Sequence, residues 1–240
     1  MVYSNYYAHR RRRSFFSRTS LNNILILINV IAFILISIIL VIEGIKDNVT
    51  DIDNSIFRFV ALNPSLFFQG YFWTLLTSMF MHAGFGHLFV NMVSMFFIGS
   101  FVERLIGRKR YLWFYLISGL VAGFFFIFLA FIGQYIPNGE EIFGDTNTFA
   151  VGASGALFGL GGLLAVLIPK LKVLVFFIIP MPMWFAMIVL MFGLWAISAA
   201  ANLPVGNTAH FGGLIVGVIY GFYLRKRYSK KVKLLNRMFG

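Results

Sequence analysis

The sequence contains no cysteine, and only 12% of its 240 residues are charged. The lack of cysteine excludes disulfides and a cysteine nucleophile, and it leaves the redox compartment undetermined. The scarcity of charge is more informative, because a soluble domain is about a quarter charged and about half apolar. Here 60% of the residues are hydrophobic. The composition therefore predicts a membrane protein.

Two further absences narrow the chemistry. There is no His-Glu-x-x-His motif, which a zinc-dependent membrane protease would need for two histidine ligands and a general base. His82 and His87 are five residues apart, so they do not share a helix face as a chelating pair would. No two aspartates lie within the apolar runs, so an aspartyl membrane protease is also excluded. We expect no metal and no cofactor.

Apolar runs long enough to cross a bilayer, about 20 residues each, recur along the chain. They predict an all-α polytopic protein with six membrane helices. The domain would cover residues 21–224, between a basic cytoplasmic arm at 1–20 and a basic cytoplasmic tail at 225–240. The first run is too long for a signal core, so we expect a retained helix. The six predicted spans are 21–42, 81–101, 111–132, 151–168, 179–200 and 209–224.

The net charge of +12 does not indicate nucleic-acid binding, because the basic residues lie in short clusters beside the apolar runs. All lysines and arginines except Lys46 and Arg58 fall in the N-terminus, every second loop or the C-terminus. The acidic residues, Glu103 excepted, fall in the other loops. This positive-inside pattern predicts that both termini are cytoplasmic. The basic ends would also attract anionic membrane lipids.

Ser154 stands among glycines and alanines at the start of the fourth run. An isolated membrane serine usually bonds a backbone carbonyl one turn back, and small residues usually serve helix packing. A structural role becomes less favoured here because other polar residues lie at the same depth. With a helix rise of about 1.5 Å per residue, Ser154, His87 and His210 all lie about 22–26 Å from the basic boundary of a core about 30 Å thick. Polar groups at such a depth are costly unless they face a partner or water.

These residue types indicate nucleophilic catalysis. A serine hydroxyl needs a neighbouring base, and His87 and His210 are both candidates. No carboxylate lies at that depth, so the unit would be a dyad without an acidic third member. The Asn91 amide, the His87 ring and the Ser154 backbone N–H could bind an oxyanion, which leaves His210 as the base.

The ordered set of motifs resembles the rhomboid family of intramembrane serine proteases over about residues 21–224. The resemblance implies a six-helix bundle with Ser154 as nucleophile and His210 as general base. It also implies an oxyanion hole made by His87, Asn91 and the Ser154 amide. The motifs are Gly152-Ala153-Ser154-Gly155, His87-x-x-x-Asn91 with His82 upstream, Ala209-His210-Phe211-Gly212-Gly213 with Gly217, Trp73 and Glu103.

The resemblance also implies how the site is supported. The last helix would pack on the serine helix through glycines, with Gly213 against the Gly159 region, and Phe158 would stack on the His210 ring. Thr74 departs from the family, in which many members have arginine after the tryptophan. We expect Glu103 to anchor the inner loop through neighbouring arginines, and His82 to be structural. The supporting residues are Gly152, Gly155, Phe158, Gly213 and Gly217.

The predicted function is hydrolysis of peptide bonds in or near transmembrane segments of membrane proteins. The alternatives are a non-catalytic relative that binds membrane clients and a six-helix transporter. A dead relative should lack the serine or the histidine, and a transporter should show internal repeats. We expect a prokaryotic plasma membrane, a site opening to the outer face, and a gate at the 201–208 loop or the fifth helix. The natural substrate and the oligomeric state do not follow from the sequence.

Overall fold

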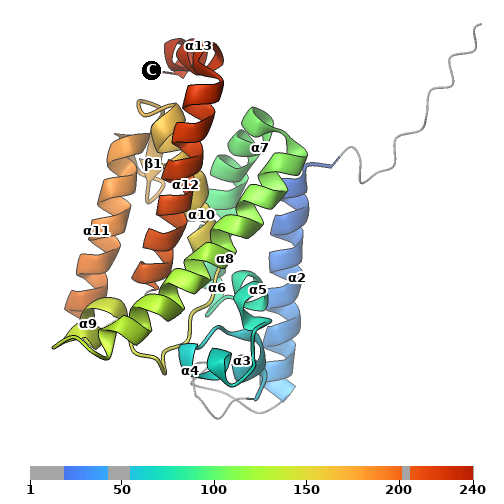
Figure 1. Cartoon of the computed structure of the whole chain (residues 1–240). Coiled ribbons are helices and arrows are strands. Elements are labelled where there is room, and N and C mark those ends of the chain that lie inside the picture. The colour runs from blue at the N-terminus through green and yellow to red at the C-terminus, as the bar shows by residue number, and fades with distance from the viewer. Residues whose placement is uncertain (1–18, 43–54, 202–205, 240) are drawn as a thin grey trace, which may run out of the picture.

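The computed structural model describes residues 19–42, 55–201 and 206–239, and it is mostly helical (Figure 1). Helical segments occupy all six predicted spans, and the predicted all-α membrane bundle is confirmed. Within the described ranges, four segments are long and apolar enough to cross a membrane: Leu21–Ile42, Phe85–Ile106, Arg108–Gly133 and Met183–Ala200. That the other two segments cross the membrane remains a prediction. The six segments are α2 (Leu21–Ile42), α6 (Phe85–Ser94) continued through the π-helical η2 (Met95–Gly99) into α7 (Ser100–Ile106), α8 (Arg108–Gly133), α10 (Ser154–Leu167), α11 (Met183–Ala201) and α12 (Asn207–Arg227).

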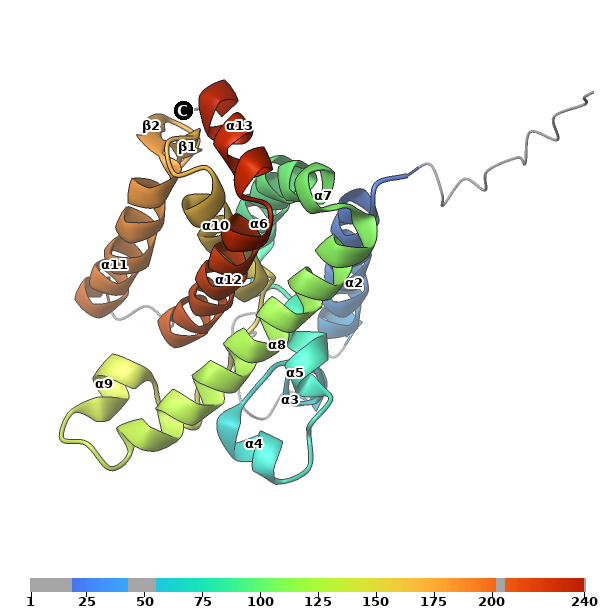
Figure 2. The ribbon, with the colours of Figure 1, turned by 45° about the horizontal axis from the view of Figure 1, so that its top comes forward.

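Helix α10 lies at the centre of the bundle, with α12 and α8 against it and α11 and α2 toward opposite sides (Figures 1 and 2). Glycines allow α12 to approach α10 closely. A Cβ at Gly213 would overlap the carbonyl oxygen of Gly155, and one at Gly217 would overlap that of Gly159. The predicted contact of Gly213 with the Gly159 region is confirmed, because a Cβ at Gly159 would lie 3.2 Å from the Gly213 carbonyl oxygen. Gly213 therefore packs between Gly155 and Gly159, and Gly217 extends the contact by one turn.

Glu103 holds the start of α2. Its carboxylate accepts hydrogen bonds from the Ser20 hydroxyl at 2.5 Å and from the backbone N–H groups of Leu21 and Asn22, each at 2.9 Å. These are N–H groups that the first turn of a helix leaves without partners. The buried carboxylate thus anchors a helix N-terminus, and its predicted contact with the neighbouring arginines stays a prediction.

Asn22 continues this network into the bundle. Its amide donates to the Met95 carbonyl and to the Ser100 hydroxyl, both at 3.0 Å, and its oxygen accepts from the Tyr111 hydroxyl at 2.5 Å. Met95 begins the π-helical turn η2. The buried Asn22 amide thus joins α2 to the π-helical turn η2 and to α8.

Two helices begin about one turn later than the approximate bounds predicted from the sequence. Residues before α6 are extended, so the second helix begins at Phe85 rather than at 81, and His82 precedes it. The fifth helix begins at Met183 rather than at 179, because an antiparallel hairpin of β1 (Lys172–Val175) and β2 (Ile179–Pro182) precedes it. Pro180 and Pro182 explain the late start, since proline disfavours helical geometry in the residue before it.

Short helices cover the end of the bundle opposite the hairpin (Figure 1). Aromatic rings pack there, Phe67 lying edge-on to Phe72 at 5.0 Å. Residues 43–54, which come before these short helices in the chain, lie outside the described ranges. At the hairpin end, the predicted tail forms the helix α13 (Ser229–Phe239). The short helices are α3 (Ser55–Val60), α4 (Pro64–Phe68), α5 (Thr74–Thr77), the 3-10 turn η1 (Ser78–Phe80) and α9 (Gly139–Phe143).

Candidate active site

A short extended segment delivers Ser154 to the start of α10. Leu62 and Ala150 exchange two backbone hydrogen bonds, at 3.1 and 2.7 Å, and the Gly152 N–H donates to the Ser78 carbonyl at 2.8 Å. Gly152 has a φ of +118°, a conformation that side chains disfavour. This turn makes Ser154 the first residue of α10. Its backbone N–H is therefore one of those without a partner inside the helix.

Ser154 and His210 meet between two helix ends. His210 lies in the first turn of α12, and its Nε2 is 2.7 Å from the Ser154 Oγ, within hydrogen-bonding distance. The close approach of Gly213 to Gly155 brings the two first turns together. The His210 Nδ1 is buried and has no hydrogen-bond partner among the residues that the structure describes. Within the described part of the chain, the pair therefore has no carboxylate behind it.

Phe158 holds the imidazole from one side. Its ring stacks on His210 with centroids 4.4 Å apart and planes 13° from parallel. Phe158 is one turn after Ser154 on α10, so hydroxyl and stacking ring come from the same helix. His210 is only 7% exposed. Packing against Phe158 therefore restrains the ring, in place of a hydrogen bond at Nδ1.

His87 borders the same space as Ser154. A Cβ built at Gly152 would lie 2.9 Å from the His87 Nε2 and 3.7 Å from the Ser154 Oγ. Asn91 is buried one turn along α6, and its Nδ2 donates to the His87 carbonyl at 2.8 Å. That bond uses one of the two amide N–H groups. His87 thus lies beside the serine, with Asn91 bonded to its backbone.

His82 lies behind this set rather than in it. It is buried before α6, and its ring packs edge-on against His87 with centroids 5.1 Å apart. It therefore buttresses His87. Across residues 19–42, 55–201 and 206–239, no three histidine, aspartate or glutamate side chains are grouped so that they could hold a metal.

The contribution of Ser78 could not be anticipated from the sequence. Its backbone carbonyl fixes Gly152, whereas its side chain has no part in that bond. Backbone contacts of this kind depend on no residue type, so no motif signals them. The glycine in the Gly152-Ala153-Ser154 motif was the only sequence signal of an unusual turn at this place.

The fold and the site define a class: a helical membrane protein with a serine–histidine pair between two helix N-termini. A family model described as a rhomboid domain matches residues 69–227, which is more than half of the chain. The chain belongs to the rhomboid family, and it is an integral membrane protein.

Several curated proteins are similar to this chain. RHOMBOID-like protein 2 of Arabidopsis thaliana is 38% identical over 65% of this chain and 43% of its own length. Rhomboid protease GluP of Bacillus subtilis is 34% identical over 66% of this chain and 27% of its own length. Rhomboid protease AarA of Providencia stuartii is 29% identical over 70% of this chain and 61% of its own length. In each case the match spans less than two thirds of the relative.

Proposed function

We propose that the protein is an intramembrane serine endopeptidase that hydrolyses peptide bonds in or near transmembrane segments of other membrane proteins. The observation that supports this most is the 2.7 Å separation between the Ser154 Oγ and the His210 Nε2. A hydroxyl becomes an effective nucleophile when a base within this distance takes its proton. Membership of a family whose relatives include named proteases points the same way.

In the proposed mechanism, the Ser154 Oγ adds to the substrate carbonyl carbon while its proton passes to the His210 Nε2. The tetrahedral intermediate collapses, the C–N bond breaks, and the leaving amine takes the proton from His210. A water molecule then adds to the acyl ester and gives a proton to the same nitrogen. Collapse releases the carboxylic acid product, and the proton returns to the Ser154 oxygen.

The oxyanion of each tetrahedral intermediate needs donors placed in advance. We assign this role to the Ser154 backbone N–H, the His87 ring and the second N–H of the Asn91 amide. The bond from Asn91 to the His87 carbonyl supports this by coupling the two side chains. The N-terminus of α10 adds a favourable dipole for negative charge.

The proposed depth of the site within the membrane supports this substrate class. A transmembrane helix shields each peptide bond with its own hydrogen bonds, so a bond can reach Ser154 only after local unwinding. We propose that the substrate enters sideways past α11. Met187, in the first half of α11, packs near Gly161 of α10, whereas Phe192 and Ile197 farther along are exposed. The 201–208 loop, which is the alternative gate, includes residues outside the described ranges.

Separate Ser154→Ala and His210→Ala variants test the dyad. Each should lower cleavage of a single-span reporter in detergent by about 10³-fold or more, because the two groups act as one unit. Ser94→Ala, a serine substitution in α6, is the control and should cleave normally. Melting curves should show that all three variants remain folded. Undiminished cleavage by a folded Ser154→Ala or His210→Ala variant would remove the assignment.

A fluorophosphonate probe gives a second measure that needs no substrate. It should label the wild-type protein and the Ser94→Ala variant but not Ser154→Ala. Probe labelling without any reporter cleavage would mean that the nucleophile is right and the substrate class is wrong.

A further inference from the structure

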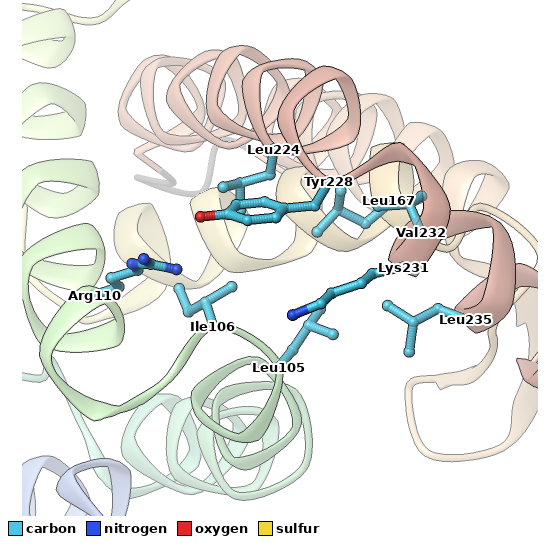
Figure 3. Close-up of a pocket in the computed structure, with 9 residues that line it drawn as sticks. All are labelled: Leu105, Ile106, Arg110, Leu167, Leu224, Tyr228, Lys231, Val232 and Leu235. Atoms are coloured by element: carbon cyan, nitrogen blue, oxygen red, sulfur yellow. The ribbon is translucent and has the colours of Figure 1, made fainter.

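A pocket of about 130 Å³ lies at the end of the bundle away from Ser154 (Figure 3). One of its lining residues, Leu167, ends α10, whereas Ser154 begins it. At about 1.5 Å per residue the two are roughly 20 Å apart, so the pocket is separate from the active site. Its lining is mostly aliphatic, with three polar side chains. The lining residues are Leu105, Ile106, Arg110, Leu167, Leu224, Tyr228, Lys231, Val232 and Leu235.

Three cations surround the ring of Tyr228. The Arg110 guanidinium is 6.0 Å from the ring centroid, that of Arg227 is 5.9 Å away and the Lys231 Nζ is 5.8 Å away. A hydrogen bond from Arg227 and the charge of Arg110 lower the pKa of the Tyr228 phenol, which reflects a positive local field. None of the described residues that line the pocket is acidic. Like charges gathered in this way repel one another unless an anion lies among them.

The pocket is built by α13, which is held in place by specific contacts. The Asn236 Nδ2 donates to the Leu167 carbonyl at 2.7 Å, and Phe239 packs edge-on against Phe101 with centroids 5.5 Å apart. Val232 and Leu235 face the pocket, while Lys230 is exposed. A helix with one apolar and one basic face suits the surface of an anionic membrane.

We propose that this pocket binds an anionic phospholipid. The headgroup phosphate would lie between Arg110 and Lys231, which extend toward the space beside Tyr228 from opposite sides in Figure 3. The first carbons of an acyl chain would contact Leu105, Leu224 and Leu235. Basic pockets beside membrane helices at the cytoplasmic surface favour such headgroups. The pocket combines cations with an aliphatic lining. This combination suits a lipid, which has a charged headgroup and an apolar chain, better than a free anion, which has no apolar part.

Lipid binding to the purified full chain tests the proposal. The wild-type protein should take phosphatidylglycerol in preference to phosphatidylcholine by about tenfold or more when native mass spectrometry counts bound lipids. An Arg110→Gln/Lys231→Gln variant should lose about 10- to 30-fold in phosphatidylglycerol binding, since each basic group near a membrane surface contributes about a fivefold factor. Lys231→Gln alone, at an exposed position, should lose a smaller part without any effect on folding.

The matched control is Lys109→Gln/Lys230→Gln. It removes the same charge from neighbouring exposed positions of α8 and α13 that do not line the pocket, and it should keep binding within about threefold. An equal loss in both double variants would mean diffuse surface attraction and would overturn the site. So would equal uptake of the two lipids, or displacement of phosphatidylglycerol by inorganic phosphate alone. The readout is independent of proteolysis, so it can fail while the proposed enzyme activity stands.

Discussion

At the scale of single residues, the site depends on groups that substitute for a missing carboxylate. Ser154 and His210 are 2.7 Å apart, and the far nitrogen of His210 has no partner among the described residues. In a triad, an acid on that nitrogen would orient the ring. Here the stacked Phe158 ring supplies the restraint. The proposed base is therefore positioned by packing, which works only while the surrounding helices stay in place.

Gly152 is the residue at which a single methyl group should disturb this site most. A Gly152→Ala variant combines a φ of +118° with a Cβ 2.8 Å from the His87 ring. The conformational strain costs about 1–3 kcal/mol. Displacement of His87 or Ser154 should lower kcat/KM on the single-span reporter by about 100-fold.

The control is Gly70→Ala, which has a similar φ of +106° but nothing within 4 Å of the added carbon. It should be strained and yet keep cleavage within a few-fold of wild type. Equal activities of the two variants would show that the contact with His87 is irrelevant.

At the scale of elements, the helix contacts are made by small residues and by one buried charge. Gly213 and Gly217 let α12 lie on the backbone of α10, which sets the relative height of His210 and Ser154. Glu103 caps α2 from α7. Neither contact should tolerate substitution, because a helix backbone or an N-terminal turn cannot move aside as a flexible side chain can.

Gly217→Ala should therefore destabilise the protein. The added carbon would overlap the Gly159 carbonyl and lie 2.9 Å from the Leu163 nitrogen. Overpacking of this kind costs about 1–3 kcal/mol. Thermal unfolding in detergent should show the loss, while Gly193→Ala on α11, with nothing within 4 Å, should unfold no earlier than wild type. A normal melting temperature for Gly217→Ala would contradict the helix register.

Glu103→Gln should also destabilise the chain. The amide retains one oxygen for three donors and turns its own N–H groups toward them, so at least one buried polar group loses its partner, at about 1–3 kcal/mol. Denaturant unfolding would measure the change. Glu141→Gln, at an exposed position of α9, should stay within about 0.5 kcal/mol of wild type. Equal stability of the two variants would mean that the cap is unimportant.

At the scale of the whole molecule, charge and fold divide the bundle into two ends. The hairpin, α13 and the start of α2 lie at one end, and α3, α4 and α9 lie at the other (Figures 1 and 2). We propose that the first end is cytoplasmic and that the site opens to the outer face. The relatives include bacterial, plant and mitochondrial proteins, so this orientation rests on the charge pattern of the chain itself.

The lack of native cysteine makes that orientation directly testable. Glu141→Cys and Lys230→Cys each introduce a single thiol at an exposed position at opposite ends of the bundle. In intact host cells an impermeant maleimide should label the cysteine at position 141 at once. It should label the one at position 230 only after the membrane is permeabilised. The reverse pattern would invert the proposed topology.

The sequence by itself determined the membrane class and the approximate positions of the six helical segments, because apolar length and composition can be measured along one dimension. It also identified Ser154, His210, His87 and Asn91 as candidates, because their residue types and depths can be read from the chain. The late starts of α6 and α11 depended on local backbone geometry that hydropathy does not detect. Their apolar residues continue through segments that are not helical.

Only the tertiary structure decided how the segments meet. The contact of Gly213 with Gly155, the capping of α2 by Glu103 and the pocket beneath α13 all join residues far apart in the chain. Such pairings depend on the rotation and height of each helix relative to its neighbours. Those two quantities follow from the packing of all the surfaces together, and the periodicity of any one segment leaves them open.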